Sequence, residues 1–324
     1  NRLLNILLMN TPILLFVLIF VIFGLMSHRF LEIESLTNIV KQASYIGIVA
    51  VGMTFVLLTA GIDLSVGSNM YLSAILAGLA ISNFGVSPWI ALLVCLASGF
   101  IFGAINAFFV TKVKIIPFVV TLATMVAGRG LGLLLTKSRA VHFPDAVVQI
   151  GSTNLFDVLP LPIAIFALVV LVAFILLNNM PIGRQIYAVG NDPEAAKKAG
   201  INTDKVLATT FILCGVLAAL GGFISVAQLG IVNSGFGKGD EFDAIAAAIL
   251  GGASLFGGIG SVFPGTVLGA ILIQMVWSGL VFTQVNLYLQ PLLFAAILFL
   301  AVFLDSLRSR ILSKLRRRRI RVDE

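Results

Sequence analysis

The chain alternates between long apolar runs and short polar segments. Apolar runs of about twenty residues recur along it, and twenty residues of helix cross a hydrocarbon core about 30 Å thick. The runs are continuous rather than alternating, which excludes a transmembrane barrel. About ten transmembrane helices are therefore predicted, some of them short or broken by glycine, at 10–26, 38–60, 64–82, 88–110, 117–136, 160–178, 206–227, 243–256, 263–284 and 288–304.

The eighth run is the shortest. Its apolar core, 244–255, is below the length that a perpendicular transmembrane helix needs, so one interpretation is a re-entrant segment. If the run crosses instead, part of 230–243 has to dip below the outer surface to meet it.

Composition agrees with a membrane protein. The 324 residues are 59% hydrophobic and only 11% charged, whereas about a quarter of an average soluble domain is charged. We expect an all-α polytopic membrane protein with one domain over 1–305 and a basic tail over 306–324. The first run has no small-residue cleavage pattern after it, so it is interpreted as a retained span. Because the chain opens on Asn1, we expect its native start to lie upstream.

The positive charges predict an orientation. If all ten runs cross and the N-terminus is cytoplasmic, most of the 21 Lys and Arg residues fall in cytoplasmic segments. The positive-inside rule favours this arrangement, which places both termini in the cytoplasm and requires an even number of crossings. The tail repeats Leu307, Ile311 and Leu315 between arginines, as expected of an amphipathic anchor on anionic membrane lipid. A docking role for the tail is the alternative.

A short helix is predicted within the polar cytoplasmic segment 179–205. Asp192 can cap it, Pro193 suits its first position, and Gly200 can take the left-handed conformation that ends it. Glu194 complements the positive helix end. A well-delimited helix outside the bilayer indicates a docking element, composed of Asp192, Pro193, Glu194, Ala195, Ala196, Lys197, Lys198 and Gly200.

The link between the second and third runs, 61–67, reads Gly-Ile-Asp-Leu-Ser-Val-Gly. Asp63 is placed to cap the third helix, which is the structural interpretation. The functional alternative is a hinge, in which Gly61 and Gly67 absorb dihedral changes around Asp63 and Ser65 as helices rock.

These motifs resemble a known family. The chain is similar to the permease subunits of ABC sugar importers, the family that includes the ribose, galactose, galactofuranose and autoinducer-2 systems. The resemblance covers nearly the whole chain in order. Its motifs are Gly-Met-Thr at 52–54, the 61–67 segment, Gly183-Arg184 with Tyr187, Gly190-Asn191, Gly200-Ile201, 241–246 and Gly251-Gly252.

The resemblance implies a cytoplasmic coupling loop that docks on a separate ATPase subunit. Glu194, Ala195, Ala196 and Gly200 match that loop's motif, although the Leu-Pro that follows in the broader motif is absent. It also implies a second permease chain, identical or paralogous, and an extracytoplasmic solute-binding protein. The location implied is the bacterial cytoplasmic (inner) membrane. No nucleic-acid partner is expected.

Catalytic motifs are missing from the sequence. No Gly-x-x-x-x-Gly-Lys-Ser/Thr pattern occurs, so ATP and magnesium are expected on a partner chain and no cofactor on this one. No metal-ligand spacing is present, and the isolated histidines and the cysteines in apolar runs are interpreted as structural. An enzyme is therefore not expected. The alternatives are a permease for branched-chain amino acids or nucleosides, or an ATP-independent secondary transporter.

Polar residues at membrane depth are the candidates for the solute pathway. Arg129 lies twelve residues into the fifth run, where a charge is either functional or reaches to the outer interface. The family often carries Arg-Gly there, which favours a structural clamp. Glu241 and Asp243 begin the short eighth run and can complement its helix dipole or face the solute. The others, each also explained by an interhelical hydrogen bond, include Asn69, Thr121, Thr124 and Gln274.

Overall fold

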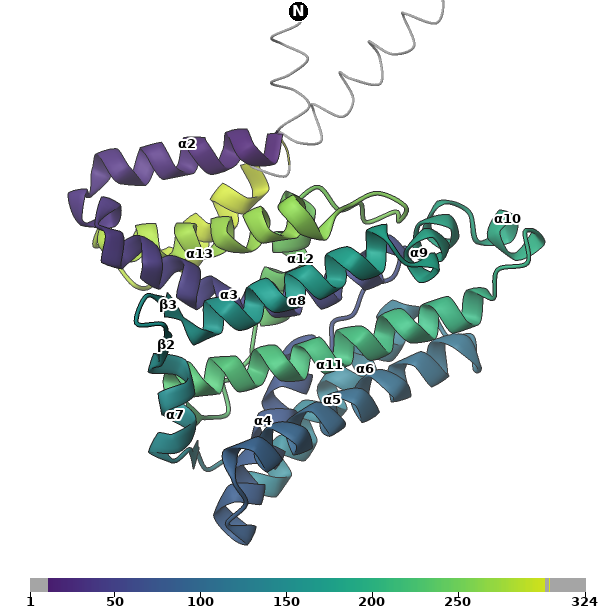
Figure 1. The fold of residues 1–324 in the computed structure, drawn as a ribbon, viewed down its shortest axis with the longest axis horizontal. Coiled ribbons are helices and arrows are strands. Elements are labelled where there is room, and N and C mark those ends of the chain that lie inside the picture. The colour runs from purple at the N-terminus through teal and green to yellow at the C-terminus, as the bar shows by residue number, and fades with distance from the viewer. Residues whose placement is uncertain (1–10, 301–302, 304–324) are drawn as a thin grey trace, which may run out of the picture. The chain divides into compact units, whose positions relative to one another are not determined.

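The computed structural model describes residues 11–300 and 303, which are helical apart from short connections and four two-residue strands (Figure 1). The basic tail at 306–324 lies outside the described residues. The α-helices are α2 (Thr11–Met26), α3 (Ile33–Leu58), α4 (Val66–Phe84), α5 (Pro88–Thr111), α6 (Pro117–Thr136), α7 (Asp145–Ser152), α8 (Leu161–Asn178), α9 (Pro181–Asn191), α10 (Pro193–Lys198), α11 (Thr203–Leu229), α12 (Asp240–Leu250) and α13 (Val267–Phe282). Two short irregular helices are η1 (His28–Leu31) and η2 (Val262–Thr266), and a further apolar helix covers Gln290–Leu300.

The chain is a polytopic helical membrane protein. Within the described residues, six helices are long and apolar enough to cross a membrane. Each of the ten expected runs also contains a helix, although α12 and the two helices nearest the ends of the described chain are short. The six are Ile33–Leu58, Pro88–Thr111, Pro117–Thr136, Leu161–Asn178, Thr203–Leu229 and Val262–Phe282.

The expected extent of the eighth run, 243–256, is wrong at both ends. Helix α12 begins at Asp240 and stops at Leu250. It stops there because the following segment contains Gly252, Gly257, Gly258 and Gly260, whose positive φ angles do not continue a right-handed helix.

Residues 40–270 form one compact unit, in which α11 packs along α5 and α4 (Figure 1). Small residues allow this close approach. A Cβ atom on Gly99 would overlap Ala219 and the Gly215 carbonyl, and one on Gly103 would overlap the Phe211 carbonyl. Gly99 and Gly103 stand four residues apart, which is the small-residue spacing that lets membrane helices approach closely.

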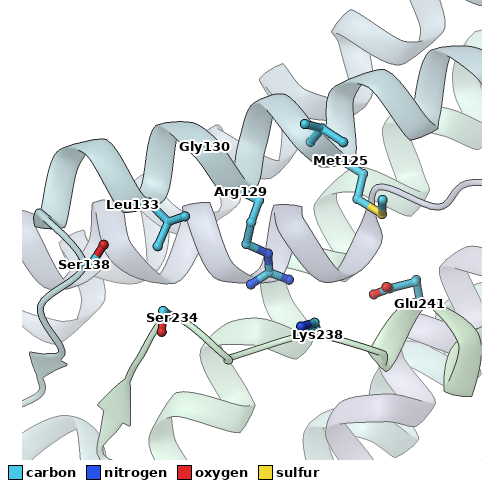
Figure 2. A pocket seen from close by; sticks show the side chains of 9 residues that line it. Met125, Arg129, Gly130, Leu133, Ser138, Ser234, Lys238 and Glu241 are labelled. Atoms are coloured by element: carbon cyan, nitrogen blue, oxygen red, sulfur yellow. The ribbon is translucent and has the colours of Figure 1, made fainter.

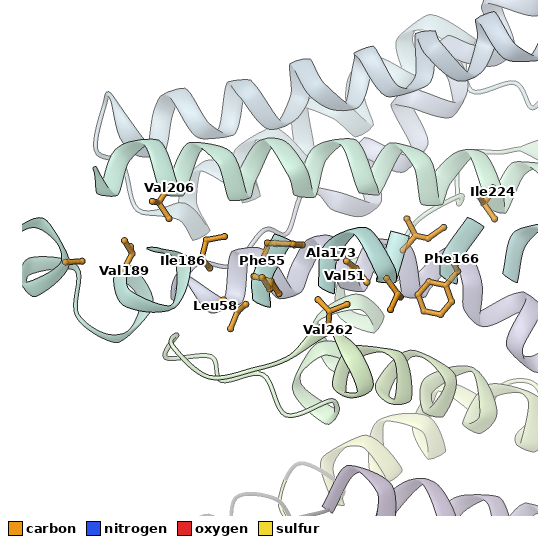
Figure 3. Close-up of a cluster of buried hydrophobic side chains, with 14 residues drawn as sticks. Val51, Phe55, Leu58, Phe166, Ala173, Ile186, Val189, Val206, Ile224 and Val262 are labelled. Atoms are coloured by element: carbon orange, nitrogen blue, oxygen red, sulfur yellow. The ribbon is translucent and has the colours of Figure 1, made fainter. Parts of the chain in front are cut away.

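A long apolar cluster runs through the same unit and joins α3, α8, α9, α10, α11 and η2 (Figure 3). It continues from the bundle interior to α9 and α10, because Val189 and Ala196 belong to it together with Phe55 and Leu58. Its members are Ile48, Val51, Phe55, Leu58, Phe166, Val170, Ala173, Leu177, Ile186, Val189, Ala196, Val206, Ile224 and Val262.

The second compact unit comprises 1–39 and 271–324, of which α2, η1, the start of α3, most of α13 and Gln290–Leu300 are described. Phe30 of η1 is fully buried among the rings of Phe20, Phe23 and Phe282. Gly279 of α13 packs directly on Phe23. Aromatic stacking thus organises this unit.

The connections on the side opposite α9 and α10 contain short β-strands, which the expected all-α fold does not include. Strand β1 (Val141–His142) pairs antiparallel with β4 (Ile231–Val232), and β2 (Asn154–Leu155) pairs with β3 (Leu159–Pro160). Helix α7 packs on α11, where Gly151 lies against the Ala227 backbone. These short elements fix the far end of α11 to its neighbours.

Candidate functional site

Helix α10 has the terminal geometry that the sequence predicts. The Asp192 carboxylate accepts hydrogen bonds from the amides of Glu194 and Ala195, each at 3.0 Å. At the other end Gly200 has φ +85°, and its amide donates to the Lys197 carbonyl oxygen at 3.0 Å. Asn202 then caps α11 by accepting from the Lys205 amide at 2.9 Å. Each end of α10 is thus fixed by a local hydrogen bond.

All residues of α10 except one are exposed. Ala196 is buried in the long apolar cluster, whereas Pro193, Glu194, Ala195, Lys197 and Lys198 are exposed. The helix therefore rests on the cluster through a single small side chain and presents an acidic and a basic end to its surroundings.

Helix α9 is the part of this region that sequence reasoning missed. The helix begins at Pro181, a residue that suits the first helical position. Its buried residues recur three and four positions apart, as in an amphipathic helix: Gly183, Ile186 and Gly190. Burial raises the pKa of the Tyr187 hydroxyl on α9 above its ordinary value, because burial disfavours the phenolate. The hydroxyl consequently stays a hydrogen-bond donor across physiological pH.

The 61–67 turn is built on a buried polar network. Asp63 is buried, and one of its carboxylate oxygens accepts from both the amide and the hydroxyl of Ser65. The Asn106 amide donates to the Ser65 hydroxyl at 2.8 Å, and the Thr124 hydroxyl donates to Asn106 at 2.7 Å. The expectation that Asp63 caps the third helix is wrong, because Ser65 is the N-cap of α4 and Asp63 holds Ser65 in place.

Gly67 has a packing role. A Cβ atom there would overlap the Gly237 carbonyl oxygen and the Glu241 carboxylate. Glu241 is buried and accepts from the Gly239 amide at 3.3 Å, next to the N-terminus of α12. The start of α4 thus meets the backbone of the segment that precedes α12, with the Glu241 side chain beside the contact.

This contact lies well inside the bundle. Met70 of α4 packs against Gly237 and also against Gly222 of α11. Gly222 precedes Leu229, the last residue of α11, by seven residues or about 10 Å of helix. The chain therefore turns back along α11 toward the interior of the unit before α12 begins.

Arg129 clamps this returning segment to α4 and α6. Its guanidinium donates to the Phe236 carbonyl oxygen at 2.6 Å and lies 4.7 Å from the centroid of the Tyr71 ring. Tyr71 is fully buried, and the guanidinium over its ring makes a cation–π contact. Arg129 thus contacts both the returning segment and α4.

A cavity of about 700 Å³ opens beside the clamp (Figure 2). Arg129 points into it from α6, and Ser234, Lys238 and Glu241 line it from the returning segment and α12. The remaining lining consists of Met125, Val126, Gly130, Leu133 and Ser138. The wall therefore offers cations, a carboxylate and hydroxyls beside an apolar strip of α6, a mixture that suits a hydroxyl-rich solute.

The other pathway candidates are distributed through the fold. Asn69 donates to the Gly215 carbonyl oxygen at 2.9 Å and accepts from Ser73, which makes it an interhelical packing residue. Thr121 donates to the Ile62 carbonyl oxygen at 3.3 Å and thereby supports the 61–67 turn. Asp243 lies half-buried in the first turn of α12. Gln274 donates to Ser278 within α13, in the other compact unit.

Among residues 11–300 and 303, no group of three or more His, Cys, Asp and Glu side chains is arranged to hold a metal. Cys95 and Cys214 are buried and unbridged.

The family described as "Branched-chain amino acid transport system / permease component" matches residues 35–302. Among characterised proteins, the chain is 38% identical to the ribose import permease protein RbsC of Escherichia coli K12, over 87% of this chain and 88% of that protein. It is 33% identical to the autoinducer 2 import system permease protein LsrC of Photorhabdus laumondii, over 91% and 89%. It is 31% identical to the fructose import permease protein FrcC of Rhizobium meliloti, over 91% and 84%. No solved structure matches.

Proposed function

We propose that this chain, which belongs to the family of bacterial ABC-importer permease components, carries a sugar or sugar-like solute into the cytoplasm. The observation that carries the proposal is similarity over about nine-tenths of the chain to import permeases for ribose, autoinducer 2 and fructose. As a member of this family it is a multi-pass protein of the bacterial inner membrane and a non-catalytic subunit.

ATP hydrolysis then belongs to a partner, and helix α10 is the proposed docking element for that ATPase. The helix is capped at both ends and exposed apart from Ala196. Its acidic first turn and its Lys197 and Lys198 offer charges of both signs for an interface. Ala196 connects it to the long apolar cluster, so a force on α10 reaches the membrane helices.

The proposed solute pathway runs along the cavity beside Arg129. Charged side chains at membrane depth face protein or water rather than lipid, because exposing a charge to hydrocarbon is costly. Arg129, Lys238 and Glu241 share one cavity on this chain. A second permease chain facing α6 would shield them from lipid, with the pathway between the two chains. Ten crossings with both termini in the cytoplasm are part of the same proposal.

Transport is proposed to proceed by alternating access. An extracytoplasmic binding protein delivers the solute, ATP binding brings the partner ATPases together, and α10 moves with them. The bundle then rocks at the 61–67 turn, where the buried Asp63 network meets the close contact of Gly67 with Gly237. A pathway of this kind binds solute weakly enough to release it.

Two other functions follow from different readings of the chain. The family description names branched-chain amino acids, and the cavity holds charges of both signs that a zwitterion would satisfy. A secondary transporter would instead use proton or sodium coupling and need no ATPase. The resemblance to sugar import permeases over about nine-tenths of the chain favours the sugar importer over both.

Reconstitution tests the proposal. We expect the chain, co-purified with its ATPase and supplied with its binding protein in liposomes, to take up radiolabelled ribose, fructose or another sugar only when MgATP is present. Leucine is the matched competitor and should leave sugar uptake unchanged. Uptake of leucine instead of sugars would reassign the solute. Uptake by this chain alone under a proton gradient would overturn the ABC mechanism.

A further inference from the structure

The glycine-rich segment between α12 and η2, residues 251–261, lies directly against α9. We call it the glycine loop. The Tyr187 hydroxyl of α9 donates to the carbonyl oxygen of Gly260 at 2.9 Å. The half-buried Tyr187 side chain thus holds this loop to α9.

Backbone contacts reinforce the bond. A Cβ atom on Gly190 would overlap the Leu58 carbonyl oxygen and lie 2.6 Å from the Gly258 nitrogen. The Gly258 amide donates to that same Leu58 carbonyl at 2.9 Å. A Cβ atom on Gly257, which has φ +84°, would lie 2.7 Å from the Gly190 carbonyl oxygen. Helix α9, the end of α3 and the glycine loop therefore meet with no side chain between them.

The glycine loop is closed on itself. The Ser254 amide donates to the Ile259 carbonyl oxygen at 2.8 Å, and the Gly257 amide donates to the Ser254 carbonyl oxygen at 3.2 Å. The Phe256 amide also donates to the Ser254 hydroxyl at 3.1 Å. A loop closed by its own hydrogen bonds transmits displacement better than an open one.

Helix α12 connects the glycine loop to the cavity. Its eleven residues span about 16 Å, so a shift of the loop carries to Glu241 at the other end. Glu241 lines the cavity and meets Gly67 of the 61–67 turn. Gly251 lies against Gly265, and Gly269 lies against the Ala247 carbonyl, so the C-terminal end of α12 is closely packed.

We propose that the glycine loop relays movement of α9 and α10 to α12, and so to the cavity wall at Glu241 and Lys238. Tyr187 is the positioning residue of this relay, because its hydroxyl ties the loop to α9. The proposal rests on the proposed function, in which a docked ATPase moves α10. It adds a route that does not run through the covalent connection from α10 into α11.

A cysteine reporter in the cavity measures the relay. Ser234 is exposed in the cavity, and Cys95 and Cys214 are buried, so Ser234→Cys is expected to dominate labelling by a water-soluble maleimide. In the complex with its ATPase, the labelling rate is compared with and without a non-hydrolysable ATP analogue. The parent S234C chain should show a nucleotide-dependent change in that rate.

Tyr187→Phe in the S234C background should reduce this nucleotide-dependent change about three- to tenfold, because one neutral hydrogen bond contributes about 1 kcal/mol. ATPase co-purification and basal hydrolysis should stay at parent levels. Tyr288→Phe, which removes a hydroxyl from an exposed tyrosine, is the matched control and should behave as the parent. Gly190→Ala is the stronger variant, because its methyl group would displace Leu58 and Gly258 from α9.

The outcomes separate the relay from the proposed function. An unchanged nucleotide response in Tyr187→Phe, equal to that of Tyr288→Phe, would overturn the relay even if Gly190→Ala misfolded. A parent complex that binds ATPase yet shows no nucleotide effect at S234C would also overturn it. If no ATPase associates with the parent chain, the proposed function itself fails and the relay falls with it.

Discussion

Asp63 lies inside the bundle, where a carboxylate is stable only if donors surround it. Ser65 supplies two of those donors, its amide and its hydroxyl. The Ser65 hydroxyl in turn accepts from Asn106, whose side-chain oxygen accepts from Thr124. One serine hydroxyl thus connects the turn before α4 to α5 and α6.

Ser65→Ala tests this network at the residue scale. The change removes a donor from Asp63 and an acceptor from Asn106, and leaving buried polar groups unpaired costs about 1–3 kcal/mol each. We expect a clear fall in the apparent melting temperature of the detergent-purified chain. Ser82→Ala, at an exposed serine of the same helix, should leave it unchanged. Equal melting temperatures for the two variants would show that the network contributes little.

At the scale of elements, the two ends of α10 are set by capping residues. Asp192 satisfies two amides of its first turn, and Gly200 adopts the left-handed conformation that its last turn needs. Both features follow from residue type and spacing, so they are visible in the sequence. The burial of Ala196 in the long apolar cluster depends on tertiary packing instead.

Glu194→Arg and Gly200→Pro test docking. Glu194 is exposed, so reversing its charge should leave the fold intact while changing the surface offered to the ATPase. Gly200→Pro removes the amide that donates to Lys197 and forbids the observed φ of +85°. We expect both variants to insert normally and to lose stimulation of ATP hydrolysis. Normal solute uptake in both would contradict docking at α10.

At the scale of the whole molecule, the cavity beside α6 raises the question of what faces it. Helix α6 exposes one side along much of its length, and Gly130 on that side has open space around it. An apolar surface can face lipid, but the charged side chains of Arg129 and Lys238 in the same cavity are costly to expose to lipid. A second permease chain on this side satisfies both observations.

Gly130→Cys with a short bis-maleimide linker tests that assembly. If α6 faces a second permease chain, we expect a cross-linked species of about twice the monomer mass in membranes. Leu168→Cys, at an exposed position on α8, is the control for collisions in the bilayer. A cross-linking yield no greater at position 130 than at position 168 would place the second chain elsewhere.

The sequence predicts the local features well because they depend on neighbouring residues. Helix positions follow from apolar runs, and the capping of α10 and α11 follows from Asp192, Gly200 and Asn202. The role of Gly99 in packing follows from small residues four apart. Helix α9 was missed, because an eleven-residue helix in a polar segment gives a weaker signal than a membrane span.

Long-range contacts could not be predicted in the same way. Arg129 and Phe236 are separated by more than a hundred residues, and so are Thr54 and Thr266, whose hydroxyls lie 2.7 Å apart. Residue spacing suits both Asp63 and Ser65 for the cap of α4. Only the structure shows that Ser65 is the N-cap. The extent of α12 also depended on glycine conformations that residue type alone leaves open.

By itself, the sequence determined that this is a helical membrane protein and where helix α10 begins and ends. These follow from hydrophobicity and capping, which act over one helix or less. Only the tertiary structure decided that Arg129 clamps the returning segment, that a polar cavity opens beside it, and that the glycine loop meets α9. Each of these brings together atoms distant in sequence, and packing of the whole chain fixes their separation.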